Sequence, residues 1–234
     1  MAQCLDADGI GHIGQLHRRQ PQIAAEFPAE NEATAKSRDD RLFHRLARRD
    51  DRRCGQRDAA PRDGITPEDA ATIPGAHAVE VYNHTSGVHA ARGSGSYFLD
   101  ALLNTGRRIN ALACDDAHFN VPGRPMADAF GGWVVVRAVH NTAPALLAAL
   151  KAGAYYATQG PQFHRVTISG NALDIACSPV AHVALLGRGA RVEHAFGHHM
   201  TAACLRLTRF EGDWARHVLT DAQGRQARSN SILL

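Results

Sequence analysis

The segment from residue 77 to residue 116 carries the pattern that most restricts the fold. Residues 77–83 ("HAVEVYN") alternate and are rich in β-forming side chains, which predicts a strand. Residues 94–106 place apolar side chains at helical spacing and end in a glycine, which predicts a helix. Residues 109–113 ("INALA") form an apolar run typical of a strand buried on both faces. Because strands joined by a long crossover usually pair in parallel, the segment predicts a parallel strand–helix–strand unit.

The same order recurs in outline further along the chain. Residues 131–139 predict a strand, residues 141–153 a helix and residues 154–159 another strand. Beyond them the helical period disappears, and short strand-like segments alternate with glycine turns. The fold class is therefore α/β, with an α/β region over residues 63–161 and a small antiparallel, sandwich-like β subdomain over residues 162–234.

The first 62 residues differ from the rest of the chain. They are rich in Arg, Asp, Gln and Ala, and charges of both signs alternate without a clear period of 2 or 3.6. This pattern is typical of an irregular segment that is disordered or loosely helical. A second hypothesis is that residues 1–62 are a frame-shifted or mis-started translation upstream of a coding segment, because orderly sequence begins abruptly near Asp63.

Composition narrows the range of partners. The chain has 26 Lys and Arg against 23 Asp and Glu, a net charge of +3, which gives no reason to expect a nucleic-acid partner. Five cysteines occur without a C-x-x-C pair, so neither a zinc knuckle nor a disulfide framework is indicated. No signal peptide or membrane-spanning run is recognisable. We expect a cytoplasmic protein with reduced thiols and no membrane partner, and the oligomeric state stays open.

Polar side chains follow the two strands of the first unit. Glu80 and Asn83 lie at the end of the first strand, and Asp116 and His118 follow the second. Ligands of parallel α/β folds bind at the carboxyl ends of the strands. On an extended backbone Asp116 and His118 face the same side, and a carboxylate with an imidazole suits Zn, Mn or Fe. The alternative is that Asp115 and Asp116 cap a turn, and two ligands are fewer than the three or four of a stable zinc site.

A cysteine nucleophile, a phosphate-binding loop and further histidine ligands have weaker support. Cys114 precedes two acids in a buried strand, which raises a thiol's pKa and argues against a nucleophile. Residues 92–96 ("RGSGS"), with Arg107 and Arg108, are compatible with a phosphate-binding loop. His84 and His89, in the loop that we expect after the first strand, are more typical of surface or packing histidines than of ligands.

Several ordered segments resemble one known family. "VEVYN", "LDALLNTGRRINALACDDAH", "GGWVVVRA", "LLAALKAGAYYATQGP" and "DAQGRQARSNSILL" resemble the polymerase and histidinol phosphatase (PHP) superfamily, in particular its CehA/McbA-like metallohydrolases. The resemblance runs from about residue 64 to the end. It implies part of a distorted (β/α) barrel that holds divalent Zn, Mn or Fe ions. The implied activity is hydrolysis of phosphoesters or other esters of small molecules by a metal-activated water. Asp116 and His118 match the family's Asp-x-His and would be catalytic metal ligands, whereas Glu80 and Asn83 would bind substrate.

The chain also departs from the family pattern. The family opens with a His-x-His strand, and nothing in residues 1–62 matches it. We therefore keep two alternatives to an active hydrolase: a non-catalytic remnant, and a small-ligand or phosphate-binding module on the same scaffold. A missing half-barrel would leave the strands at residues 79–83 and 109–116 with an open edge where earlier strands should pair, and we expect association or poor solubility through that edge.

Overall fold

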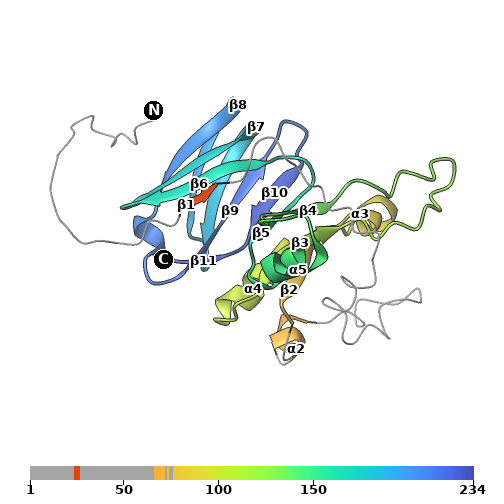
Figure 1. Cartoon of the computed structure of the whole chain (residues 1–234), viewed down its shortest axis with the longest axis horizontal. Coiled ribbons are helices and arrows are strands. Elements are labelled where there is room, and N and C mark those ends of the chain that lie inside the picture. Colours follow the sequence, from red (N-terminus) through yellow and green to blue (C-terminus); the bar gives the residue numbers. More distant parts are fainter. Residues whose placement is uncertain (1–23, 27–65, 72, 74–75) are drawn as a thin grey trace. The chain divides into compact units, whose positions relative to one another are not determined.

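The computed structural model describes residues 24–26, 66–71, 73 and 76–234 (Figure 1). These residues divide between two compact units. The α/β unit contains the described residues up to 159 other than 24–26, together with residues 229–231. The sheet unit contains residues 24–26, 160–228 and 232–234. Apart from β1 (Ala24–Glu26), the predicted irregular segment 1–62 lies outside the described residues.

The α/β unit follows the predicted order of elements and contains one additional helix, α3. Its elements are α2 (Pro67–Ala71), β2 (Ala78–Asn83), α3 (His84–Ala90), α4 (Ser96–Asn104), β3 (Asn110–Cys114), β4 (Trp133–Val136), α5 (Ala143–Lys151) and β5 (Tyr155–Thr158). β2 and β3 pair in parallel, with Ala78 opposite Asn110 and Asn83 opposite Cys114. The predicted parallel strand–helix–strand unit is therefore confirmed.

The apolar face of α4 explains how this helix is held against β2 and β3. Leu99, Leu102 and Leu103 are buried at helical spacing, and α4 packs against β2. Val81 of β2 and Ala111 of β3 have no exposed surface. A buried leucine contributes about 2 kcal/mol of transfer free energy, so this stripe holds the helix on the two strands.

The outer edge of β2 is not open where the sequence suggested an open edge. Asn83 N–H donates to the carbonyl of Gly93 at 2.9 Å, and Gly95 N–H donates to the carbonyl of Val81 at 3.0 Å. A Cβ on Gly93 would lie 2.7 Å from the Asn83 oxygen, and a Cβ on Gly95 would lie still closer to the Glu80 oxygen. The glycines of the "RGSGS" segment thus allow the chain to pair with its own strand edge. The expectation of an open edge is wrong over the second half of β2.

One side chain near the end of the chain joins β3 to β5. Asn230 Oδ1 accepts from the Ala111 N–H at 2.8 Å, and its Nδ2 donates to the carbonyls of Gly153 and Tyr155 at 2.8 and 3.0 Å. One amide therefore satisfies three backbone groups next to these strands. No pattern in the sequence predicts this role of Asn230.

The second strand–helix–strand segment does not repeat the parallel pairing of the first. β4 and β5 pair antiparallel, with Trp133 opposite Thr158 and Val136 opposite Tyr155. The Arg137 N–H donates to the Ala154 carbonyl at 2.9 Å, so the chain leaves β4 and enters β5 at the same end. The segment between the two strands, which contains α5, therefore begins and ends at the same end of the strand pair. The two segments therefore share their order of elements and differ in how their strands pair.

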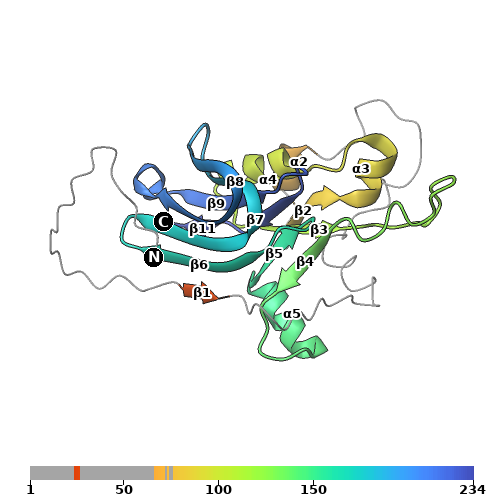
Figure 2. The same cartoon turned by 90° about the horizontal axis from the view of Figure 1, so that it is seen from above.

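The sheet unit is antiparallel, as predicted, but it is one open sheet and not a sandwich. Its strands are β6 (Phe163–Ser169), β7 (Ala172–Gly187), β8 (Val192–Arg206), β9 (Trp214–Thr220), β10 (Gln226–Ser229) and β11 (Ile232–Leu233), with the short helix η1 (Thr208–Phe210) between β8 and β9. β7 pairs with β6, β8 and β9 (Figure 2). β10 and β11 both pair with β9. β1 pairs with β6.

The described residues form no closed barrel. The observed fold is mixed α/β, dominated by the open antiparallel sheet, with β2 and β3 as a small parallel pair. None of the described helices is long and apolar enough to cross a membrane.

Candidate functional site

Three of the four predicted site residues meet at the ends of β2 and β3. Asn83 Nδ2 donates to Glu80 Oε2 at 3.2 Å and to Asp116 Oδ2 at 3.3 Å. The parallel register brings them together, because Asn83 stands opposite Cys114 and Asp116 follows two residues later. We call Glu80, Asn83 and Asp116 the strand-end cluster. Its two carboxylates share one amide donor, and all three side chains are half-buried.

Asn83 has a second role, because it is the N-cap of α3. Its backbone is extended (φ −119°), and its Oδ1 accepts from the Ser86 N–H at 2.7 Å. This is the standard side-chain cap of a helix N-terminus. The prediction that His84 and His89 lie in a loop is wrong, because both lie in α3.

The segment after β3 docks on the first turn of α3. Thr85 N–H donates to the Asp115 carbonyl at 2.9 Å, and Thr85 Oγ1 donates to the Asp116 carbonyl at 2.8 Å. Asp116 is left-handed (φ 51°), a conformation that aspartate tolerates better than most residues. The extended backbone assumed for Asp116 and His118 is therefore absent. The exposed His118 ring makes no hydrogen bond to the strand-end cluster in the described structure.

Asp115 closes the loop that connects β3 to β4. Its carboxylate accepts from the backbone N–H groups of Phe130, Gly131 and Gly132 at 2.6, 2.8 and 2.8 Å. These three donors lie 15 to 17 residues further along the chain. Both carboxylate oxygens are thus used by loop 115–132, and Asp115 is a structural anchor rather than a free ligand.

A second aspartate fixes the same loop from its other end. Asp128 is fully buried, and its Oδ2 accepts from the N–H groups of His118 and Phe119 at 2.8 and 3.0 Å. Burial alone would raise the pKa of Asp128, but these backbone hydrogen bonds outweigh it, and the pKa lies below its ordinary value. Asp128 is therefore a carboxylate at neutral pH.

Two glycines let loop 115–132 return close to α3 and β2. A Cβ on Gly131 would collide with the His84 ring, and a Cβ on Gly132 would lie 2.9 Å from the Tyr82 ring. The His84 ring is held by Tyr82 Oη at 3.0 Å and by the Ala127 carbonyl at 3.1 Å. Two sequence features indicate that loop 115–132 folds back in this way. An acid, Asp115, directly follows β3, and a Gly-Gly pair directly precedes β4.

Cys114 matches the prediction that it is not a nucleophile. Its thiol donates to Glu80 Oε1. Burial raises the pKa of the Cys114 thiol well above its ordinary value, and the charges of Glu80 and Asp116 act in the same direction. The Cys114 thiol therefore stays protonated and donates a hydrogen bond to the strand-end cluster.

The strand-end cluster as arranged does not fit a metal ion. An amide nitrogen lies between the two carboxylates, in the position that a shared cation would take. Among the described residues, no group of three or more His, Cys, Asp or Glu side chains could hold a metal. The roles of Asp116 and His118 as catalytic metal ligands, and of Glu80 and Asn83 in substrate binding, stay predictions. The remaining metal ligands would have to lie outside the described residues.

The glycine-rich segment and Arg107, proposed for the alternative phosphate-binding site, make contacts within the fold. Residues 93–95 pair with β2, and the guanidinium of Arg107 donates to the carbonyls of Ala70 and Ile73 next to α2. Both features are therefore used in packing.

The sheet unit contains charged and polar side chains that are almost fully buried. Arg216, His217 and Arg228 are each at most 6% exposed. His217 lies edge-on to the Phe163 ring, with 4.9 Å between ring centroids. Burial lowers the pKa of His217 to about 4, and the charge of Arg216 acts in the same direction. His217 is therefore neutral at pH 7, with a packing role.

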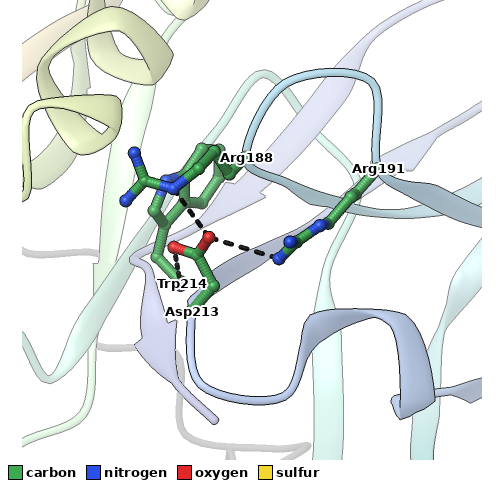
Figure 3. Close-up of polar contacts among 4 residues, drawn as sticks. All are labelled: Arg188, Arg191, Asp213 and Trp214. Carbon is green, nitrogen blue, oxygen red and sulfur yellow. Dashed lines mark hydrogen bonds and ion pairs between the residues drawn. The ribbon is translucent and has the colours of Figure 1, made fainter.

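An ion-pair group ties the hairpin between β7 and β8 to the start of β9 (Figure 3). Asp213 Oδ2 accepts from Arg188 Nε at 2.7 Å and from an Arg191 nitrogen at 3.2 Å, while Oδ1 accepts from the Trp214 N–H at 2.8 Å. The hydrogen bond from Arg188 helps to hold the pKa of Asp213 below its ordinary value. The arrangement links the β7–β8 hairpin to the start of β9, so we assign it to stability and not to chemistry.

Comparison with known proteins gives no relative on which to base a function. No family model, no curated protein and no solved structure matches the chain.

Proposed function

We propose that this chain is part of a metal-dependent hydrolase of the PHP type that acts on phosphoesters or other esters. The observation that carries the proposal is the strand-end cluster. Glu80, Asn83 and Asp116 come from two parallel strands and converge at their carboxyl ends, where parallel α/β proteins place their ligands. In this proposal β2 and β3 are neighbouring strands of the partial barrel that the resemblance implies.

The proposal assigns a role to each predicted residue. Glu80 and Asn83 would contact the substrate, and Asp116 and His118 would contribute to a Zn, Mn or Fe site. Since the strand-end cluster does not fit a metal ion as arranged, further ligands from outside the described residues are required, and Asp116 would have to leave the Asn83 amide. We therefore derive no catalytic step from the described residues.

The hydrogen bonds of the acids favour a second candidate, a non-catalytic remnant on the same scaffold. Asp115 and Asp128 bind backbone N–H groups, and Glu80 and Asp116 share the Asn83 amide. Every one of these carboxylates already has a partner that stabilises the fold. A chain that has lost its metal would be expected to use its acids in this way.

Metal content and ester hydrolysis of the purified chain separate the two candidates. The variant is the Asp116→Ala/His118→Ala double mutant, and the control is His140→Ala, which removes an exposed histidine elsewhere in the α/β unit. A hydrolase predicts Zn, Mn or Fe near one equivalent and hydrolysis of aryl phosphates or aryl esters, both lost in the double mutant and kept in the control. Equal metal content and no hydrolysis in all three proteins would contradict the hydrolase and support the remnant.

A further inference from the structure

Two histidines of the sheet unit lie on one face of the β7–β8 pair. His182 of β7 stands opposite Phe196 of β8, and His194 of β8 stands opposite Ala184 of β7. Alternate residues of a strand share a face, so His182, His194 and Phe196 point to the same side. His182 and His194 are diagonal neighbours across the pair, which is within reach of long side chains.

The two imidazole rings are close enough to share one ion. Their centroids are 6.1 Å apart and the rings are inclined by 63°. A metal–nitrogen bond is about 2 Å and a ring nitrogen lies about 1.1 Å from the ring centre, so two rings on one ion have centroids up to roughly 6.4 Å apart. Rotation of the side chains can therefore bring both imidazoles onto one ion without moving the strands.

The nitrogens of both rings are available. Within the described structure neither His182 nor His194 makes a hydrogen bond, and both rings lie against each other and against Phe196. His194 is exposed and His182 is partly exposed. Phe196 stacks on His182 at 4.2 Å with nearly parallel planes, so it covers the face of the ring and leaves the nitrogen-bearing edge accessible.

We propose that His182 and His194 together bind one transition-metal ion that prefers imidazole ligands, namely Cu²⁺, Ni²⁺ or Zn²⁺. Water completes the coordination, because no group of three or more metal-binding side chains exists among the described residues. With two protein ligands the site is exchangeable, and it binds more weakly than a structural zinc site with four ligands. It lies in the other unit from the strand-end cluster and does not depend on the proposed hydrolase function.

The test is calorimetric titration of Ni²⁺, and then Zn²⁺, into the full chain after removal of bound metal with a chelator. The variants are His182→Ala, His194→Ala and the double mutant. The matched control is His198→Ala/His199→Ala, which removes two exposed histidines from the same strand. We expect one ion per chain at the two-histidine site, counted as the binding that the double mutant loses. We expect an affinity for it at least tenfold lower in each single variant, and no effect in the control. Circular dichroism and Tm confirm that each variant is folded.

Two results would overturn the proposal: unchanged affinity in the folded His182→Ala/His194→Ala mutant, or loss of affinity in the control alone. The Asp116→Ala/His118→Ala mutant distinguishes this site from the proposed hydrolase site. Binding that persists there and disappears in the His182→Ala/His194→Ala mutant supports the two-histidine site whatever the outcome for hydrolysis.

Discussion

At the scale of single residues, Asn83 connects more of the candidate site than any acid does. Its amide nitrogen serves Glu80 and Asp116, and its amide oxygen caps α3. The sequence predicted that these three residues meet, because the carboxyl ends of parallel strands share an edge. It did not predict that they bind one another.

We expect Asn83→Ala to lower the free energy of unfolding by about 1–2 kcal/mol, since it removes an N-cap and the donor shared by two carboxylates. Chemical denaturation at pH 7 measures the change. The control is Asn120→Ala, an exposed asparagine in loop 115–132 that should leave stability within about 0.5 kcal/mol. Equal effects in both variants would show that the strand-end cluster contributes nothing to stability.

His217 makes a pH-dependent contribution in the sheet unit. Its pKa in the folded chain is about 4, against an ordinary value of 6.5 in the unfolded chain. Between these values the unfolded chain binds more protons, so the stability that His217 permits at pH 7 is lost as the pH falls from 6.5 towards 4. The full difference corresponds to roughly 3 kcal/mol.

Comparison of the folded protein with a His217→Leu variant isolates this contribution. We expect the stability difference, wild type minus variant, to fall steadily between pH 6.5 and pH 4.5 in urea unfolding. A Val218→Ala variant, which shortens a buried apolar side chain of β9, should change the stability by the same amount at every pH in this range. A difference that does not change with pH would mean that His217 is protonated or accessible in the folded chain.

At the scale of elements, loop 115–132 depends on two aspartates rather than on a hydrophobic core. Asp115 holds its last residues and Asp128 holds His118 and Phe119. Phe119 and Phe130 are left-handed (φ 57° and 63°) and more than half exposed. For a bulky side chain that conformation costs of order 1–3 kcal/mol, so the backbone must be held by other contacts.

Asp115→Ala should therefore release loop 115–132 while the β2–β3 pair stays folded. We expect chymotrypsin to cut after Phe119 or Phe130 at least tenfold faster than in wild type, and mass spectrometry of the fragments identifies the site. The control is Asp174→Ala, a partly exposed acid of β7. If the two variants are cut at the same rate, Asp115 does not anchor the loop.

At the scale of the whole molecule, the sequence predicted those helices and strands in which apolar and polar side chains repeat regularly from end to end. β2, α4 and β3 carry such periods, and the structure has them close to the predicted bounds. α3 ("HTSGVHA") has no buried residue, so no apolar period could reveal it, and it depends on the Asn83 cap. The antiparallel pairing of β4 with β5 and the left-handed Asp116 depend on the path of the chain, which residue spacing does not record.

The edge of β2 leads to the last prediction, because residues 93–95 now stand where the sequence suggested an open edge. A larger side chain at Gly95 would collide with the Glu80 carbonyl and force this segment off the strand. The uncovered N–H and C=O groups would then be available to another molecule. We expect Gly95→Val to show concentration-dependent association in sedimentation velocity that the wild-type chain does not show.

The matched control for that experiment is Gly170→Val in the turn between β6 and β7. Gly170 has a positive φ (57°), unlike Gly95 (φ −106°), and a Cβ there meets no atom within 4 Å, so this variant adds backbone strain without uncovering β2. Association of Gly95→Val alone would show that the glycine-rich segment protects a strand edge. Association of the wild-type chain that is no stronger in Gly95→Val would mean that another surface drives it, and the protective role of residues 93–95 would be rejected.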